Sequence, residues 1–227
     1  LGKPFDEAEL CAEVRNLLAL KAREREVEVL NRKLVEQGLS RCLPPALLEG
    51  VLKGDLEVVQ TPKLECVTVL SARLAGFEQR MRALSPSISG QLLDDYLGVV
   101  GATAFASHGT LVHFSGDRID VLFGAPEPML EMEAIQAALH CALQMHEAVR
   151  EMSAAWQREG LEPAELCVGV HGGEALVGTF GSEVRAEYTA IGPTVTLAEK
   201  LAQVAAPGSV TLCANFARGL PGEALKG

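Results

Sequence analysis

The stretch His113-Phe-Ser-Gly-Asp-Arg-Ile-Asp-Val-Leu-Phe-Gly-Ala-Pro126 decides how this chain folds. Two runs of β-forming residues flank Gly116-Asp117, and a glycine beside an aspartate between two such runs is typical of a hairpin turn. We therefore expect strands at 111–114 and 119–123. The carboxylate of Asp117 should lie at the tip of this hairpin.

Short strand patterns and longer helical patterns alternate around the hairpin. Apolar residues recur at helical spacing over 89–106 and 131–160, which predicts two helices. The pair Gly172-Gly173 is expected to separate two strands. The other expected elements are strands at 66–71, 166–170, 176–179, 188–191 and 210–213 and a helix at 194–204. This order favours an α+β fold, with a ferredoxin-like βαββαβ sheet and helices packed on one of its faces.

Residues 1–40 carry an imperfect heptad pattern ahead of this globular part. Five of the eight a and d positions are apolar, and charged residues crowd the flanks. Two interpretations remain open: a surface helix that packs on its own domain, or a signalling helix that forms a parallel two-stranded coiled coil. In the second interpretation, a buried Asn31 would fix the register of the coiled coil and the number of helices in it. The a positions are Leu10, Leu17, Glu24 and Asn31, and the d positions are Glu13, Leu20, Val27 and Leu34.

The heptad pattern ends at Leu43-Pro-Pro45, because proline lacks an amide donor and restricts the residue before it. Residues 46–53 suggest a short amphipathic turn or helix, and Gly54-Asp55 follows. We place a linker at 41–60 and one globular domain at 61–227. A length of 227 residues suits one domain with an appendage.

Composition limits the partners and the compartment. The net charge is −10 and long basic runs are absent, which argues against nucleic acid and an anionic lipid surface as partners. The longest stretch without a formal charge, 96–116, contains two histidines and four glycines, so it is a poor membrane span. The six cysteines mostly lie in apolar runs, which suits a reduced cytoplasmic protein without zinc or disulfides. Because the chain begins with Leu and shows no signal peptide, we take it to be a piece of a longer protein.

Common catalytic and metal-binding motifs are absent from the sequence. There is no Walker loop and no Gly-x-Ser-x-Gly. His140 and His146 lie six positions apart, so they would not share a helix face as a metal pair would. We interpret the histidines as core or surface residues.

Three segments carry a family resemblance. They are Val67-Thr-Val-Leu-Ser-Ala-Arg-Leu-Ala-Gly-Phe77, the hairpin above, and Tyr188-Thr-Ala-Ile-Gly-Pro-Thr-Val-Thr-Leu-Ala-Glu-Lys-Leu201. Together with Gly169-Val-His-Gly-Gly173 they resemble the core of a class III nucleotidyl cyclase domain of bacterial type, a family that makes cyclic AMP or cyclic GMP. The similarity runs from about 61 to 216. Family members usually continue past the point that matches Gly227, so we expect the last strands, and a phosphate-contacting lysine on them, to be missing.

The resemblance implies a site that lies between two domains paired head to tail. One domain of the family supplies two aspartates that hold two divalent ions. The other supplies a purine pocket, with an Asn and an Arg that support the transition state. One ion lowers the pKa of the attacking ribose hydroxyl, and the other neutralises the departing pyrophosphate. Magnesium takes few protein ligands at such a site, so each carboxylate matters.

The two aspartate positions are altered in different ways. Arg73 stands four residues before Phe77, where the family has its first aspartate. A guanidinium there removes both ligand oxygens and repels a cation. The second aspartate matches Asp117, which is either a vestigial metal ligand or a turn residue that bonds its own backbone. Arg73 is either a metal-free clamp for a nucleotide phosphate or the partner of a neighbouring Asp or Glu, and we favour the latter.

The positions of the other half-site are altered as well. His113 takes the place of a purine-reading lysine, and Thr189 lies where the family has Asp or Thr. Thr196 matches the Asn that orients the ribose, and its hydroxyl is too short for that task. Lys200 matches the transition-state Arg, and it keeps the charge but loses the planar two-point grip on phosphate oxygens.

We therefore expect a catalytically inactive cyclase-like domain that acts as a dimerising signal-transduction or assembly module. A homodimer through the coiled coil and the cyclase-type surface is expected, with a signalling protein as a further partner. Two alternatives stay open: a weak or heterodimer-dependent adenylate or guanylate cyclase that uses magnesium or manganese, and a nucleotide sensor without turnover. No cofactor is expected unless residual cyclase activity exists. The candidate residues are Arg73, Thr196 and Lys200 as degenerate catalytic positions, Gly76, Phe77, His113, Thr189, Thr196 and Lys200 for nucleotide, and Asp117 for metal.

Overall fold

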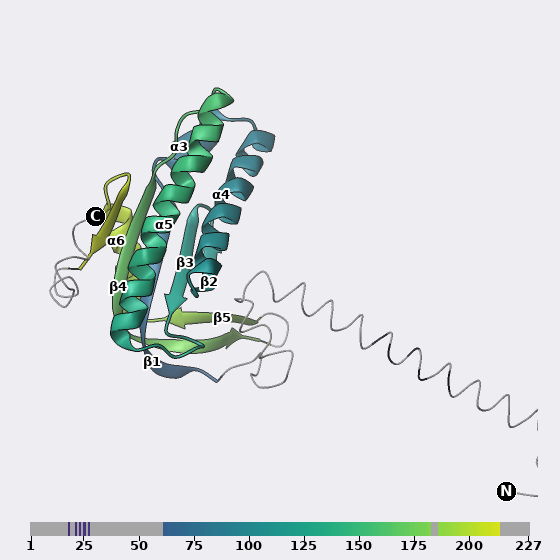
Figure 1. Cartoon of the computed structure of the whole chain (residues 1–227), viewed down its shortest axis with the longest axis vertical. Helices are drawn as coiled ribbons and strands as arrows, with labels where there is room; N and C mark the ends of the chain where they lie inside the picture. The colour runs from purple at the N-terminus through teal and green to yellow at the C-terminus, as the bar shows by residue number, and fades with distance from the viewer. Residues whose placement is uncertain are drawn as a thin grey trace, which may run out of the picture.

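The computed structural model describes residues 61–182 and 186–213 and five isolated helical positions near the N-terminus (Figure 1). Those five are Leu18, Lys21, Arg23, Arg25 and Val27. The elements are β1 (Lys63–Leu74), α3 (Phe77–Ala83), α4 (Pro86–Ala106), β2 (Thr110–Ser115), β3 (Arg118–Phe123), α5 (Glu131–Arg158), β4 (Leu166–Gly181), β5 (Ala186–Ile191), α6 (Pro193–Val204) and β6 (Ser209–Leu212).

The strands form one sheet with the predicted ferredoxin-like order. Neighbouring strands follow β2-β3-β1-β4-β5, all antiparallel, and β6 joins β4 as a parallel strand. Helices α3 and α4 connect β1 to β2, and α5 connects β3 to β4. This arrangement confirms the expected βαββαβ unit and the hairpin between β2 and β3. Strand β1 is central, because Leu70 pairs with Val121 on one side and Val170 on the other.

Helices α4 and α5 cover one face of the sheet and enclose the larger core. Apolar residues of α5 recur every three or four positions, so one side of a 28-residue helix is buried. Tyr96 of α4 and Met145 of α5 are fully buried there against Leu70 and Phe123. Both helices were expected from the sequence, and α4 begins slightly earlier than predicted, with Ser85 as its N-cap.

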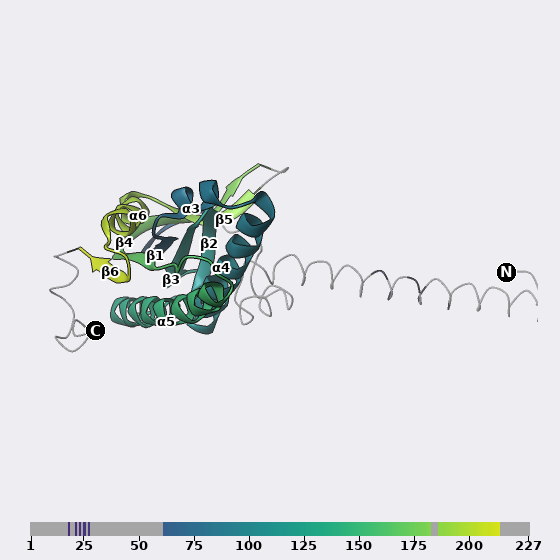
Figure 2. The ribbon, with the colours of Figure 1, turned by 90° about the horizontal axis from the view of Figure 1, so that it is seen from above.

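Helix α6 lies on the opposite face of the sheet, which corrects the expectation of helices on one face only. Figure 2 shows α5 and α6 on the two sides of the sheet. Ala198 of α6 is buried in a second core with Val67, Val69 and Leu122. Gly169 permits this approach, because a Cβ there would overlap the backbone of α6 at Ala198. The helix can therefore lie almost directly on β4.

Strand β4 runs without a break through Gly172-Gly173, so the predicted turn between two strands is wrong. Gly172 and Gly173 pair in register with Thr68 and Val67 of β1. A Cβ on Gly173 would lie 3.0 Å from the hydroxyl of Thr194, at the start of α6. The glycine therefore provides space for a neighbouring helix, which a sequence pattern does not distinguish from a turn.

The extra length of β4 carries β5 beyond the main sheet. Figure 1 draws β5 across the lower end of the sheet, and β5 contacts β2 although they are not neighbours in the strand order. Helix α3 was not expected from the sequence, since its seven residues are too few for a clear period. The linker at 41–60 lies outside the described residues, as does most of the N-terminal helix. Across 61–182 and 186–213, each helix lacks the length or the apolar run needed to cross a bilayer.

Candidate functional site

Arg73 and Asp117 face each other at one end of the sheet. Arg73 is the next-to-last residue of β1, and Asp117 lies in the turn between β2 and β3. The Arg73 Nε lies 3.6 Å from the Asp117 Oδ2, and the same oxygen accepts a hydrogen bond of 3.1 Å from the Leu74 amide. The Asp117 side chain is 10% exposed and that of Arg73 is 35% exposed. Asp117 therefore ties the hairpin tip to the end of β1.

This geometry does not fit a two-metal site. The Arg73 guanidinium supplies to Asp117 the positive charge that an ion would otherwise supply. One oxygen of Asp117 already accepts a hydrogen bond from the Leu74 amide and lies in an ion pair with Arg73, which leaves little room for a cation that demands oxygen ligands around it. Among the described residues, no three His, Cys, Asp or Glu side chains lie close enough together to hold a metal.

A pocket of about 350 Å³ opens beside this pair. It is lined by residues of four segments, the end of β1, the turn into α3, the start of β4 and the end of α6, including Arg73, Gly76, Phe77, Cys167 and Gln203. Gly76 has a φ of +65° and begins α3, a backbone conformation that favours glycine. The structure thus brings Arg73, Gly76, Phe77 and Asp117 together. These four are the first group of predicted site residues that lie close together in the structure.

His113 and Thr189 belong to a second group, where β2 of the hairpin contacts β5. The Nδ1 of His113 on β2 lies 3.9 Å from the Oε1 of Glu187 on β5. Thr189 is two residues further along β5, so it points to the same side as Glu187. Both side chains are partly exposed, at 37% and 49%. Glu187 lies in β5, which begins two residues before the strand expected at 188–191.

Thr196 and Lys200 lie one turn apart on the exposed side of α6. The Thr196 hydroxyl donates to the Gly192 carbonyl at 3.4 Å, one turn earlier in the chain. Lys200 is exposed, and its neighbour Glu199 turns toward the sheet. The two side chains therefore share a face of the helix, as their spacing requires.

A buried polar network that the sequence did not predict joins the sheet to α6. Asp120 of β3 is only 2% exposed. It accepts a hydrogen bond of 2.6 Å from the Ser71 hydroxyl, and its other oxygen lies 3.2 Å from Arg118 Nε. Arg118 also reaches Glu199 on α6, with 2.6 Å between Nη1 and Oε1. One arginine thus bridges two carboxylates from different elements.

Burial raises the pKa of Asp120, whereas the hydrogen bond from Ser71 and the charge of Arg118 oppose that rise. The desolvation penalty on the charged carboxylate is therefore larger than the stabilisation that it gains from Ser71 and Arg118. A polar residue alternating with apolar ones in 118–123 is typical of a solvent-facing strand position. The pattern alone would therefore suggest that Asp120 is exposed, and it is buried because α6 covers that face of the sheet.

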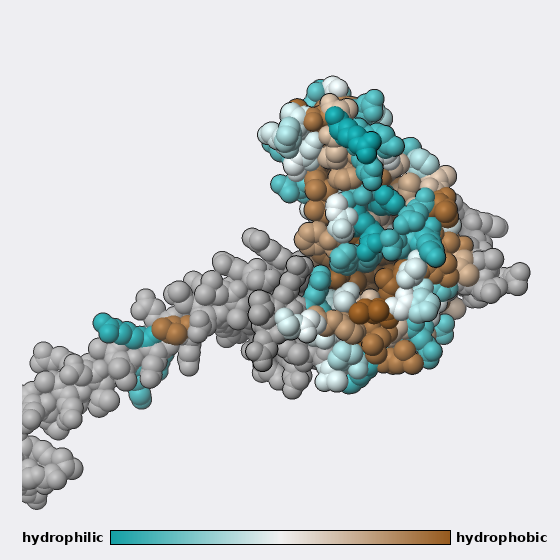
Figure 3. All heavy atoms as spheres, turned by 180° about the vertical axis from the view of Figure 1, so that it is seen from behind, coloured by the Kyte–Doolittle hydropathy of each residue, from teal (hydrophilic) through white to brown (hydrophobic). Residues whose placement is uncertain are grey.

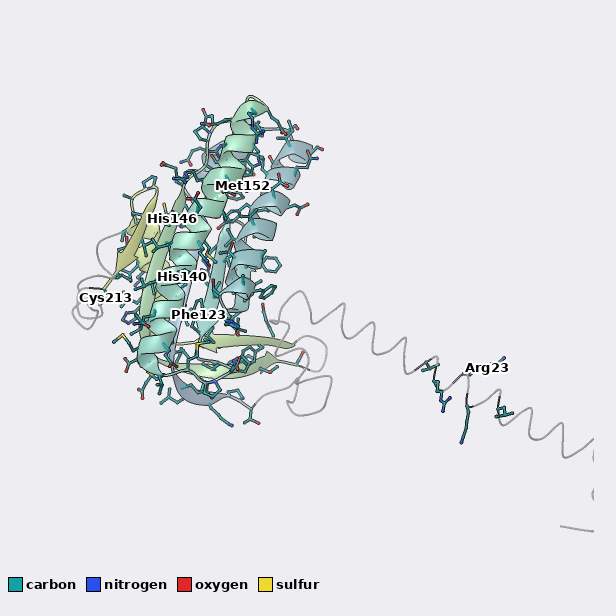
Figure 4. All side chains as sticks on the ribbon, viewed as in Figure 1. Arg23, Phe123, His140, His146, Met152 and Cys213 are labelled. Atoms are coloured by element: carbon teal, nitrogen blue, oxygen red, sulfur yellow. The ribbon has the colours of Figure 1, made fainter. Side chains whose placement is uncertain are left out.

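The histidines of α5 and the cysteines do not form a further site in the described part of the chain. His140 and His146 lie apart along α5 (Figure 4). Burial lowers the pKa of His146, which is typical of a core histidine. Cys141 and Cys167 are buried as expected, and burial raises the pKa of both thiols. Cys66 is exposed, so the expectation of mostly buried cysteines fails there.

Among the curated relatives of this chain are proteins named as adenylate cyclases. It is 29% identical over 135 residues to Adenylate cyclase 1 of Rhizobium meliloti (strain 1021), an alignment that covers 60% of this chain and 20% of that protein. It is 27% identical over 157 residues to Adenylate cyclase of Anabaena cylindrica, with 67% and 29% covered. The chain therefore spans less than a third of these relatives.

Solved structures of cyclases match the fold. The guanylyl cyclase Cya2 superposes with a TM-score of 0.66 at 29% identity, covering 69% of this chain and 79% of that one. The adenylyl cyclase CyaB from P. aeruginosa gives 0.67 at 26% identity, with 70% and 81% covered. The family profile described as "Adenylate and Guanylate cyclase catalytic domain" matches residues 59–224. This chain is a member of the adenylate and guanylate cyclase catalytic domain family.

Proposed function

We propose that this domain has kept the cyclase fold and lost the reaction, and that it works as a dimerising module in signal transduction or assembly. The observation that carries the proposal is the Arg73 guanidinium, 3.6 Å from the Asp117 carboxylate. In the reaction of the family, this end of the sheet has to anchor two divalent ions through carboxylates. Here the same end is closed by an internal ion pair.

The altered positions on α6 support the same conclusion. Lys200 and Thr196 offer a point charge and a short hydroxyl, in place of a planar cation and a carboxamide. The loss of one such electrostatic contact typically costs about 10²-fold in rate, and here several are changed together. Two identical chains that pair head to tail would therefore form two incomplete sites.

The role as a module rests on what the chain retains. The fold is complete through β6, and the heptad pattern in 1–40 would hold two chains in parallel. In such a dimer the N-terminal helices would pass a change in orientation from an upstream sensor to the paired domains. A purified chain that remains monomeric at micromolar concentration would contradict this role.

A turnover assay tests the loss of reaction directly. The chain is incubated with ATP or GTP and with magnesium or manganese, and cyclic nucleotide is measured against a blank without protein. We expect no product above the blank for any of the four combinations. Cyclic product that disappears in the Asp117→Ala variant would overturn the proposal and establish a cyclase.

The pocket beside Arg73 favours one second candidate, a nucleotide sensor without turnover. Arg73 is partly exposed and lines this pocket together with the Gly76-Phe77 turn. A guanidinium can hold phosphate oxygens without a metal. Calorimetry with ATP, GTP and the cyclic nucleotides, in the presence of a chelator, tests this candidate. Binding heat that is lost in Arg73→Ala would support it, and no heat with any of them would remove it.

A further inference from the structure

Three large apolar side chains lie side by side across the end of the sheet and remain exposed. Leu64 of β1 pairs with Leu176 of β4, which pairs in turn with Ile191 of β5. Directly opposed residues in neighbouring strands point to the same side, so the three form a continuous row. Their exposed fractions are 65%, 39% and 51%. We call these three residues the apolar stripe.

The apolar stripe lies at the lower end of the sheet in Figure 1, where β1 begins and β5 runs across. Cys66 and Glu174, the next pair toward the centre of the sheet on that side, lie near Glu131 at the start of α5. The apolar stripe thus begins where α5 no longer covers the sheet. A contiguous exposed apolar patch on such an edge is typical of an interaction site.

Residues 43–59 are the segment of the chain best placed to cover the stripe. They lead directly into β1, and Leu64 is only five positions beyond residue 59, a span of at most about 18 Å. The segment is strongly apolar and would need a surface to cover it. Its apolar residues are Leu43, Leu47, Leu48, Val51, Leu52, Leu56, Val58 and Val59.

We propose that residues 43–59 dock on the apolar stripe and so join the N-terminal helix to β5. Leu47, Leu48, Val51 and Leu52 have the spacing of one face of a short helix, which suits a row of three side chains. Strand β5 leads directly into α6. A shift of residues 43–59 would therefore displace β5 and, with it, Thr196 and Lys200 on α6. This inference rests on the proposed role in signal transduction, and it names the contact through which the signal would pass.

A second copy of the chain is a weaker occupant for the stripe. A stable interface between two proteins buries about 800 Å² on each partner. Three partly exposed side chains fall well short of that area. A short segment from the same chain needs far less, because its attachment to β1 keeps it close to the stripe at all times.

Hydrogen exchange on the full chain tests the docking. We compare wild type with Leu176→Glu, which places a charge in the middle of the stripe, and with Leu143→Glu as the matched control. Leu143 is an exposed leucine of α5, 54% accessible and outside the stripe. Because both leucines are partly exposed, both variants should fold, and unchanged exchange in α4 and α5 will verify this.

We expect peptides from 43–59 to exchange at least tenfold faster in Leu176→Glu than in wild type and in Leu143→Glu. Unprotected exchange of 43–59 in wild type, or equal protection in all three proteins, would overturn the docking. Protection of 174–192 that grows with protein concentration while 43–59 stays unprotected would assign the stripe to a second copy and would also overturn it. None of these readouts depends on turnover, so the failure of this inference and the failure of the proposed function can be told apart.

Discussion

In the proposed inactive site, Arg73 changes two properties at once, the ligand atoms and the charge. The replacement of a carboxylate by a guanidinium changes the local charge by two units, and the contact with Asp117 makes the result a neutral pair. The position of Arg73 could be predicted from Gly76-Phe77, three and four residues later. Its partner could not be identified, because Asp117 comes close only when the hairpin folds back on β1.

Arg73→Asp should create a metal site. Two carboxylates would then face each other, and a divalent ion between them would relieve their repulsion. We expect Mn²⁺ to bind this variant at least tenfold more tightly than wild type, as measured by calorimetry. At a metal concentration a hundred times its Kd, the ion should also stabilise the fold by about 2.7 kcal/mol.

The control for that prediction is the double variant Arg73→Asp with Asp117→Asn, which has one carboxylate again. It should bind Mn²⁺ no better than wild type. Equal Mn²⁺ affinity in wild type and Arg73→Asp would show that Arg73 does not block the ion, and it would remove the main support for the loss of reaction.

Asp120 should give the fold a component of stability that weakens as pH rises. Burial raises its pKa above the ordinary 3.8, so between that value and the raised pKa the folded chain holds a proton that the unfolded chain has released. Stability then falls with rising pH across this window and levels off above it. Asp120→Asn lacks this component but retains an oxygen for Ser71.

Urea unfolding of wild type and Asp120→Asn from about pH 4 to about pH 7 tests the sign. The free energy of unfolding of wild type, relative to the variant, should decrease over this range. Arg118, Glu199 and His113 also face Asp120, and they are the same in both proteins. A difference that is constant or increases with pH would contradict the raised pKa.

At the scale of elements, two glycines in β4 show what a sequence pattern cannot resolve. Gly172-Gly173 has the composition of a turn, yet it lies inside a continuous strand. Gly169 and Gly173 instead allow α6 to approach β4 closely. The existence and order of the strands could be predicted from periodicity, whereas the face that α6 covers depends on contacts between distant segments. The same contact buries Asp120, which explains why its pattern was misleading.

Gly169→Ala should destabilise the fold, and Gly98→Ala serves as its matched control. The added methyl at Gly169 would overlap the backbone of α6, so the helix has to shift, at a cost of about 1–3 kcal/mol or more. Gly98 lies in α4 with nothing within 4 Å of the new methyl. There alanine should stabilise the helix by about 0.5–1 kcal/mol. Opposite shifts in the unfolding midpoint are expected, and a neutral Gly169→Ala would contradict the close packing of α6.

For the whole molecule, the two faces of the sheet differ in how they are covered. Helices α4 and α5 close one face over the larger core, whereas α6 alone lies over the second core. Figure 3 views the molecule from behind, on the side of α6, and shows hydrophilic side chains gathered across its middle with apolar ones below. The charged residues on this side include Arg73, Arg118 and Glu199. A polar, incompletely covered face of this kind suits contact with a second domain more than a buried core.

The heptad pattern predicts how two whole chains associate, and two exposed residues of the N-terminal segment can test it. Val27 is a d position and Leu18 lies on the outer side of the helix, at a b position; both are helical, and they are 58% and 62% exposed in the single chain. In a parallel coiled coil only Val27 would be buried, and Val27→Glu would place two charges against each other there. We expect sedimentation equilibrium to show a dimer for wild type and for Leu18→Glu. The dissociation constant of the dimer should be at least tenfold higher for Val27→Glu. If both variants behave alike, the heptad seam does not hold the dimer, and the helix is a surface element of its own domain.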